Sequence, residues 1–176
     1  MRRVNVKGTS GSGKTTFSQE LARRLGVPYV ELDALHWASP RWQEPTDEDF
    51  RTSVADAMAA APDGWVIDGN YERKLGDLVI GEADTIVWLD LPLRVKLRRL
   101  WRRTMERLSG EAELWGGNRE SWRDAFWGHN SLFGWMLKTH VRQRREWPGQ
   151  YSDDPRFVRL RSDAEARAWL ERQKPV

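Results

Sequence analysis

Residues 8–15 read Gly-Thr-Ser-Gly-Ser-Gly-Lys-Thr and match the pattern Gly-x4-Gly-Lys-[Ser/Thr] in full. A glycine-rich loop of this kind turns successive backbone N–H groups toward one point and forms an anion site at the start of a helix. Lys14 adds a positive charge for the β- and γ-phosphates, and the Thr15 hydroxyl is suited to bind Mg²⁺. The loop therefore predicts a site for ATP and Mg²⁺, made of Gly8, Thr9, Ser10, Gly11, Ser12, Gly13, Lys14, Thr15 and Thr16.

The residues on either side of the loop must place it between a strand and a helix. Val4 and Val6 alternate with polar residues in a strand expected at 3–7. In the helix expected at 14–25, an apolar residue recurs every fourth position, at Phe17, Leu21 and Leu25. This context favours a phosphate-binding loop over the alternative, a flexible linker rich in glycine and serine.

Two aspartates follow short apolar runs that are typical of strands. Asp68 comes after an expected strand at 65–67, and Asp33 comes after one at 29–32. The carboxyl ends of parallel strands share one edge of a sheet, so both side chains are expected near the phosphate loop. We predict that Asp68 is an outer-sphere ligand of Mg²⁺ and that Asp33 binds or deprotonates an acceptor. The alternative for each is an ordinary cap of the next turn or helix.

A strongly basic segment lies in the second half of the chain. Residues 94–107 carry seven lysines and arginines, and spacing of four places Arg99 and Arg103 on one side of the helix expected at 93–108. Such guanidinium groups can close over a phosphate that is being transferred. A solvated basic face is the alternative, although seven like charges repel one another unless a polyanion neutralises them.

The whole chain has 176 residues, a net charge of +3 and no cysteine. Disulfides, thiolate zinc sites and cysteine nucleophiles are thus excluded, and a reducing cytoplasm is the expected location. No run of 18 apolar residues and no basic-then-apolar leader occurs, so we expect no contact with a membrane. The oligomeric state is left open.

Charge is unevenly distributed between the two halves of the chain. Residues 1–93 have 10 basic and 15 acidic residues, whereas residues 94–176 have 19 and 11. A basic half suggests a polyanionic partner, either a nucleic acid or phosphorylated small molecules. Arginine outnumbers lysine there, which favours bidentate recognition of phosphate groups.

Strand and helix patterns alternate along the chain. Further strands are expected at 85–89 and 157–160, and further helices at 46–61, 120–147 and 162–172. This alternation predicts an α/β fold in which a parallel sheet is built by right-handed crossovers. No internal repeat or interdomain linker is found, so residues 1–176 are expected to form one domain.

The order of these motifs resembles the adenylate kinase-like branch of the P-loop kinases. GTSGSGKTT is followed by VELDALHW, WVIDGNY and TIVWLDLPLRVKLRRLWRR, an order similar to that of the small DNA topology modulation (FlaR-like) and adenylate kinase-related proteins. The resemblance implies three layers, with a five-stranded parallel sheet of order 2-3-1-4-5, helices on both faces and a helical lid. It also implies an acceptor-binding segment near 34–61 and a lid near 104–135.

The resemblance also suggests roles for individual side chains. It implies an Arg-x-x-x-Arg pair at the lid hinge, which Arg98 with Arg102 or Arg99 with Arg103 can supply, and we favour Arg99 and Arg103. It also implies that Arg142 and Arg145 reach the transferring phosphate after the lid. Arg73, and more weakly Arg41, stand where related kinases bind the acceptor phosphate, although the neighbours of Arg73 differ. Trp37 in the acceptor segment carries a flat ring that can stack on a base or sugar, with packing as the alternative.

We therefore predict an ATP- and Mg²⁺-dependent kinase whose partners are a nucleotide and a small-molecule acceptor. The first hypothesis for the acceptor is a nucleoside monophosphate such as AMP. The second is a hydroxyl group of a nucleoside, sugar or antibiotic. A third, different hypothesis is a nucleic-acid-binding ATPase or regulator, which is disfavoured because the sequence contains no recognisable nucleic-acid module.

Overall fold

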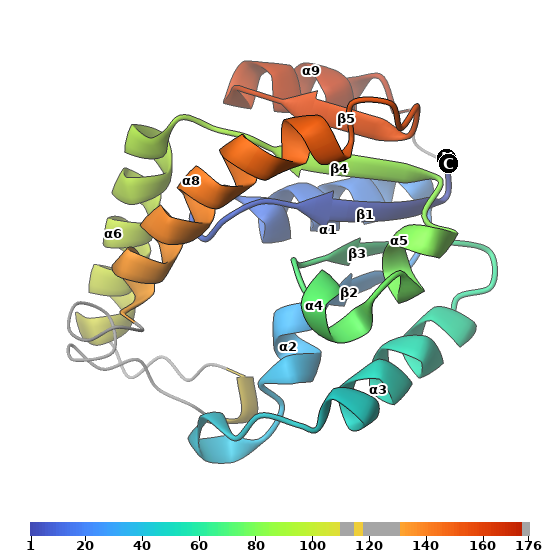
Figure 1. Ribbon diagram of the computed structural model, residues 1–176, viewed down its shortest axis with the longest axis horizontal. Helices are drawn as coiled ribbons and strands as arrows, with labels where there is room; N and C mark the ends of the chain where they lie inside the picture. Colours follow the sequence, from blue (N-terminus) through green and yellow to red (C-terminus); the bar gives the residue numbers. More distant parts are fainter. Residues whose placement is uncertain (110–114, 118–130, 174–176) are drawn as a thin grey trace.

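The structure is a computed structural model that describes residues 1–109, 115–117 and 131–173. Its centre is a five-stranded sheet in which every pair of neighbours is parallel (Figure 1). The strand order is β2-β3-β1-β4-β5, which confirms the predicted order. The strands are β1 (Arg3–Lys7), β2 (Tyr29–Glu31), β3 (Trp65–Asp68), β4 (Thr85–Leu89) and β5 (Phe157–Leu160).

Helices connect the strands and cover both faces of the sheet. The α-helices of the described residues are α1 (Lys14–Leu25), α2 (Leu32–His36), α3 (Asp47–Ala59), α4 (Glu72–Leu75), α5 (Leu78–Glu82), α6 (Leu93–Ser109), α8 (Leu132–Gln150) and α9 (Asp163–Glu171). Two short 3₁₀ helices, η1 (Pro40–Trp42) and η2 (Trp115–Gly117), contact each other.

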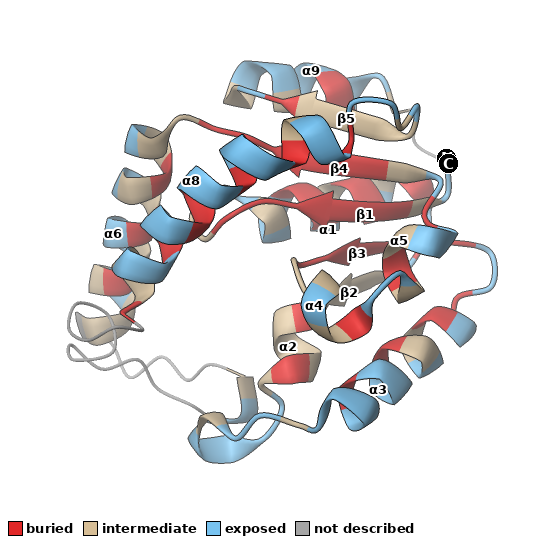
Figure 2. Ribbon diagram, viewed as in Figure 1, coloured by how far each residue is buried: buried red, intermediate tan, exposed pale blue. Residues whose placement is uncertain are grey.

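Alternate residues of the central strands enter two separate hydrophobic cores, as expected for a sheet covered on both faces. On β4, Val87 packs with Leu21 of α1 and Trp169 of α9 in one core. Its neighbour Trp88 points to the other face and packs in the core that Trp147 of α8 and residues of α3 share. Buried residues accordingly form the middle layer in Figure 2.

The ends of several helices are set by the local signals in the sequence. The Thr46 side chain accepts a hydrogen bond from the backbone N–H of Asp49 and caps α3. Ser162 caps α9 in the same way through Glu165. Gly26 adopts the left-handed conformation that ends α1. The helices predicted at 14–25, 46–61 and 162–172 are thus confirmed to within two residues at each end.

The segment after β2 differs from the prediction. The strand expected at 29–32 ends at Glu31, because Leu32 begins α2 and is buried against the sheet. The following residues 34–45, the first part of the predicted acceptor segment, contain the rest of α2 and η1. The helix predicted at 120–147 has its described part from Leu132 to Gln150, and its expected start lies outside the described residues.

The phosphate loop is packed tightly against α6. A Cβ on Gly11 would lie 2.4 Å from the backbone carbonyl oxygen of Lys96. Gly11 also has a φ of 77°, which other residues rarely adopt. Its lack of a side chain therefore allows the base of α6 to lie directly against the loop.

One fully buried carboxylate ties α8 to the sheet. Asp90 accepts hydrogen bonds from Arg144 of α8 at 2.9 Å and from Arg159 of β5 at 2.6 Å. The Arg159 guanidinium also lies over the ring of Trp88, 4.5 Å from its centroid. Asp90 thus orders the chain before α6.

Most of the predicted lid falls outside the described residues, which omit 110–114 and 118–130. Its described ends belong to α6, η2 and α8. In the part of the chain that the structure describes, no helix is long and apolar enough to cross a membrane.

Candidate active site

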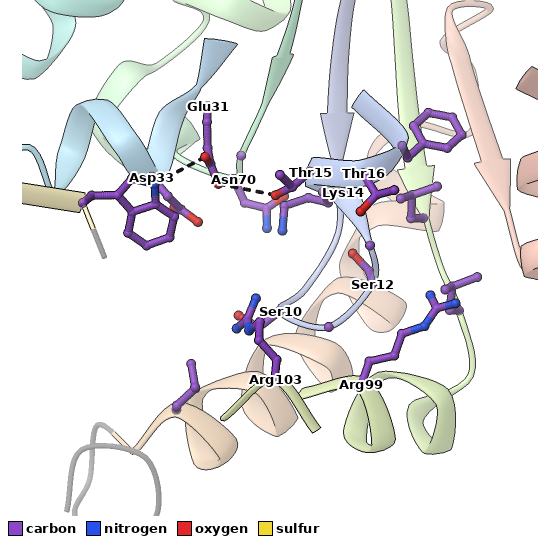
Figure 3. A pocket seen from close by; sticks show the side chains of 18 of the residues that line it. Ser10, Ser12, Lys14, Thr15, Thr16, Glu31, Asp33, Asn70, Arg99 and Arg103 are labelled. Atoms are coloured by element: carbon purple, nitrogen blue, oxygen red, sulfur yellow. Dashed lines mark hydrogen bonds between the residues drawn. The ribbon is translucent and has the colours of Figure 1, made fainter. Parts of the chain in front are cut away.

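A large cavity lies at the carboxyl edge of the sheet, where the phosphate loop, α2, α6 and α9 meet. Its volume is about 1700 Å³, which exceeds the usual 300–1,000 Å³ of a small-molecule pocket. The space is therefore sufficient for a nucleotide and a second small molecule together. Figure 3 shows residues of the phosphate loop between Asp33 on one side and Arg99 on the other.

The phosphate loop provides seven lining residues in a continuous stretch. These are Ser10, Gly11, Ser12, Gly13, Lys14, Thr15 and Thr16. Gly8 and Thr9 were predicted to belong to the same site, but they are buried behind the lining. Gly13 has a φ of 85° and stands at the N-cap of α1, so the loop leads directly into the positive end of that helix.

Three oxygen-bearing side chains near the loop suit a hard cation such as Mg²⁺. Thr15 Oγ1 lies 3.4 Å from Glu31 Oε1, at the end of β2. Asp68, which pairs in register with Glu31 on the adjacent strand, is 1% exposed and lies outside the cavity lining. Among the described residues, no group of three or more His, Asp or Glu side chains forms a metal site without help from a ligand.

The environment of Asp68 is unusual for a carboxylate. Burial raises its pKa to about 6, although nearby Lys14 opposes the shift. The Tyr29 hydroxyl donates a hydrogen bond to Asp68 Oδ2 at 3.0 Å. A divalent cation beside Asp68 would stabilise its ionised form, so the residues present fit Mg²⁺ held by Thr15 and carboxylates next to a phosphate.

Asp33 lines the cavity from α2 and has a fixed orientation. The Tyr71 hydroxyl donates a hydrogen bond to Asp33 Oδ1 at 2.7 Å. The ring of Tyr71 packs against His36 and Phe50, with centroids 4.9 and 5.1 Å away, so the donor is itself held in place. One carboxylate oxygen is thereby occupied, and the other has no hydrogen-bond partner among the described residues.

Asn70 connects the end of β3 to the phosphate loop. Its Oδ1 accepts a hydrogen bond from the Gly8 N–H at 3.1 Å, and its Nδ2 donates one to the Gly8 carbonyl at 2.6 Å. Both polar groups of the first loop glycine are therefore satisfied by one side chain. Figure 3 places Asn70 beside Lys14 and Thr15.

The predicted pair Arg99 and Arg103 both line the cavity from α6. Arg99 Nη2 forms an ion pair with Asp163 Oδ2 of α9 at 2.9 Å. Its Nη1 lies 3.4 Å from the position that a Cβ on Gly13 would take. Arg99 thus spans from α9 to the phosphate loop, which fits a contact with a bound nucleotide.

The two sides of the cavity differ in charge. Lysines and arginines line it only from α1, α6 and α9, among the residues that the structure describes: Lys14, Arg99, Arg102, Arg103, Arg107 and Arg167. The other side, which we term the acidic wall, provides Glu31, Asp33, His36, Trp37, Trp42, Glu44, Asn70, Tyr71 and Trp115. Carboxylates and aromatic rings therefore replace cations on this wall.

Four arginines predicted from the sequence lie outside the cavity lining. Arg142 and Arg145 are exposed because the inward side of α8 carries Met136, His140 and Gln143, which are buried (Figure 2). Arg142 instead lies 4.0 Å from Glu146, one turn along the same helix. The two predicted acceptor arginines, Arg41 and Arg73, are also exposed.

Other lining residues were missed at the level of sequence. Glu31 stands two residues before Asp33, so strand alternation alone would place both side chains on the same face of the sheet. The structure shows in addition that Glu31 is the last residue of β2. Trp115 lies far away in sequence, yet its Nε1 is 3.3 Å from Glu31 Oε2. Trp37, which was predicted, lines the cavity near Trp42, with ring centroids 5.4 Å apart.

A protein-family model described as an AAA domain matches residues 4–121 of the chain. A cytidylate kinase of Pyrococcus horikoshii is 27% identical over 111 residues, which are 57% of this chain and 56% of that protein. The match thus spans little more than half the length of this relative.

Two solved structures resemble the chain over almost its whole length. An unliganded sugar kinase from Janibacter sp. HTCC2649 has a TM-score of 0.56 and 24% identity, covering 98% of this chain and 91% of that one. A shikimate kinase from Acinetobacter baumannii, in complex with shikimate, has a TM-score of 0.56 and 16% identity, covering 98% and 90%. At these identities the likeness establishes the fold.

Proposed function

Since the chain belongs to the AAA domain family, we propose that it is a kinase that transfers the γ-phosphoryl group of ATP to a hydroxyl group of a small molecule. The observation that carries this proposal is the position of Asp33. It lines the same cavity as Lys14 and Thr15 and is oriented by Tyr71. A carboxylate so placed can accept the proton of an attacking hydroxyl.

In the proposed reaction, the phosphate loop and Lys14 would hold the triphosphate, and Thr15, Glu31 and Asp68 are the residues that would hold Mg²⁺. Mg²⁺ neutralises negative charge on the β- and γ-phosphates when it is bound. The acceptor oxygen forms a bond to the γ-phosphorus as the bond to the ADP oxygen breaks, and the hydroxyl proton passes to Asp33. Arg99 and Arg103 stabilise the negative charge of the transferring group.

A nucleoside monophosphate kinase is the second candidate. It is supported by the similarity to a cytidylate kinase and by the resemblance of the motif order to adenylate kinase-related proteins. An acceptor phosphate in such an enzyme needs cations, and the acidic wall has none among its described lining residues. For this reason we place the hydroxyl acceptor first.

ADP formation from ATP and Mg²⁺ over a panel of acceptors tests the proposal. The panel holds nucleosides, sugars, aminoglycosides and the monophosphates CMP and AMP, and Lys14→Ala serves as the control. We expect a hydroxyl acceptor to raise ADP formation, and the variant to reduce it by about a thousandfold. Stimulation by CMP or AMP alone would favour the second candidate, and an undiminished rate in Lys14→Ala would contradict the role of the loop.

A further inference from the structure

We propose that the acceptor carries a protonated amine as well as the hydroxyl group that is phosphorylated, and that the acidic wall recognises this positive charge. An amino sugar or an amino alcohol has this chemistry. The inference rests on the proposed function, because it assumes that the acidic wall holds the acceptor.

The charge of the acidic wall favours a cationic ligand. Glu31 has only uncharged partners among the described residues, namely Thr15 at 3.4 Å and the Trp115 indole N–H at 3.3 Å. Asp33 is likewise paired with an uncharged group, the hydroxyl of Tyr71. Mg²⁺ near Thr15 would offset Glu31, but Asp33 would still have no positive partner among the residues that the structure describes. A ligand with a positive charge would supply it.

Glu44 adds a third carboxylate, and it is the one with a cationic neighbour. Lys74 Nζ lies 2.7 Å from Glu44 Oε2, and this pairing lowers the pKa of Glu44. Lys74 itself is outside the cavity lining. The Lys74 side chain therefore partly neutralises the wall from behind, and its charge sets how attractive the wall is to cations.

The aromatic residues of the acidic wall also favour an ammonium group. Trp37, Trp42 and Trp115 line it together with Tyr71. The faces of such rings attract ammonium groups, by about 0.5–2 kcal/mol each when a ring is well placed. Rings next to carboxylates form a common arrangement for binding organic cations, whereas a phosphate would meet negative charge and electron-rich ring faces.

His36 supplies a third, independent observation. It lines the cavity but is 2% exposed, and its Nδ1 has no hydrogen-bond partner among the described residues. Burial, reinforced by the charge of Lys74, lowers the pKa of His36, which favours the neutral imidazole beside a cationic ligand. A buried nitrogen without a partner is costly, which favours a ligand that completes the hydrogen bonding of this wall.

Matched acceptor pairs test the inference by calorimetric titration of the full chain with Mg²⁺ and a non-hydrolysable ATP analogue. The pairs are glucosamine against glucose and ethanolamine against ethylene glycol, with kanamycin and CMP in addition. We expect each amine to bind at least about tenfold more tightly than its neutral counterpart, an advantage of about 1.4 kcal/mol that falls at high salt. Equal binding within the pairs, or tighter binding of CMP, would overturn the proposal.

Two variants with opposite expected effects test whether the acidic wall causes the preference for amines over their neutral counterparts. Lys74→Gln leaves the Glu44 carboxylate without its cation, so the preference for the amine should increase by a few fold. Glu44→Gln removes one negative charge from the wall and leaves Lys74 with Asp47, 3.5 Å away, as its carboxylate partner, so the preference should decrease. Shifts in the same direction for both variants, or no shift, would contradict recognition by this wall.

The outcome separates this inference from the proposed function. Binding of the amines without ADP formation from ATP would support the charge of the acceptor and contradict the kinase proposal. A higher rate of ADP formation with glucose than with glucosamine would support the kinase proposal and overturn the inference that the acceptor carries an amine.

Discussion

The side-chain amide of Asn70 is hydrogen-bonded to both backbone groups of Gly8. The donor distance to the Gly8 carbonyl is 2.6 Å, and the acceptor distance to the Gly8 N–H is 3.1 Å. Because Gly8 opens the phosphate loop, the end of β3 fixes the start of the structure that we propose binds ATP. This pair needs an amide, since no other side chain of that size both donates and accepts along one edge.

The first prediction concerns this pair. Asn70→Asp keeps the shape of the side chain but places a carboxylate oxygen against the Gly8 carbonyl, which then has no donor. We expect ATP to bind about tenfold more weakly, consistent with a cost of about 1–3 kcal/mol for an unsatisfied partly buried group. Titration of the nucleotide against the wild-type chain measures this. Unchanged affinity would show that the loop holds its form without Asn70.

The second prediction contrasts arginines inside and outside the cavity. Arg99→Ala and Arg103→Ala should each lower kcat by about a hundredfold, because they remove positive charge near the transferring phosphate. Arg142→Ala, which removes the same group from the exposed side of α8, should leave kcat within about twofold. Steady-state rates with the best acceptor decide the matter. A large loss of kcat in Arg142→Ala would instead support the role predicted from the sequence, in which Arg142 reaches the transferring phosphate.

The third prediction concerns the cation. Glu31→Gln removes one charged oxygen beside Thr15 while keeping the hydrogen bond to Trp115 feasible. The Mg²⁺ concentration for half-maximal activity should rise about tenfold, as is typical when a group near a metal is replaced. Activity measured against Mg²⁺ at saturating ATP provides the test, and Glu20→Gln is a control on the other side of the cavity. An unaltered Mg²⁺ requirement would remove Glu31 from the metal site.

The fourth prediction addresses the orientation of Asp33. Tyr71→Phe keeps the ring that packs against His36 and Phe50 but removes the hydroxyl that holds Asp33. We expect kcat/KM for the acceptor to fall by roughly tenfold, with little change in KM for ATP. Asp33→Asn should abolish most of the activity. If Tyr71→Phe instead changes KM for ATP and not kcat/KM for the acceptor, Tyr71 and Asp33 do not bind the acceptor.

The fifth prediction follows from a buried ammonium group. Lys96 is fully buried on α6, and burial lowers its pKa from the usual 10.5 to about 8. Between these two pH values the unfolded chain binds more protons than the folded one, so the contribution of Lys96 to the free energy of unfolding increases with pH. Below pH 8 both states are protonated, and the cost of burying the charge is fully present.

Lys96→Met should therefore flatten the rise between pH 8 and 10.5, and it should stabilise the protein at pH 7 by about 1–3 kcal/mol. Urea denaturation at several pH values gives the comparison. Lys138→Met, a change at an exposed lysine of α8, controls for the loss of charge. Parallel pH profiles for wild type and Lys96→Met would mean that the ammonium is not held in the environment described.

The sequence predicts much of the fold because its signals are local. The glycine loop, the apolar spacing of Phe17 and Leu21, and the caps at Thr46 and Ser162 each act within a few residues. The order of the strands, by contrast, was predicted from the resemblance to adenylate kinase-related proteins and not from local signals. Elements such as α4 and α5 were missed because they have only four and five residues and no clear periodicity.

The candidate site was harder to predict because it depends on which side of each helix faces inward. For α6, spacing of four fits both Arg99 with Arg103 and Arg98 with Arg102, and the cavity lining contains Arg99, Arg102 and Arg103. For α8, arginines stand at 142, 144 and 145, and it is the packing of this helix against both α6 and the sheet that leaves 142 and 145 exposed. The contact between Trp115 and Glu31 joins segments 84 positions apart, which no local pattern reveals.

The close fit of Gly11 against the Lys96 carbonyl has a mechanical consequence. With no room between them, the base of the arginine-bearing helix cannot advance without pressing on the phosphate loop, and the loop cannot open without displacing that helix. We therefore expect the first turns of α6 and the phosphate loop to move as one rigid unit. Movement of the arginines would then come from the later turns of α6 or from their own side chains. A residue with a side chain at position 11 would push the phosphate loop and α6 apart.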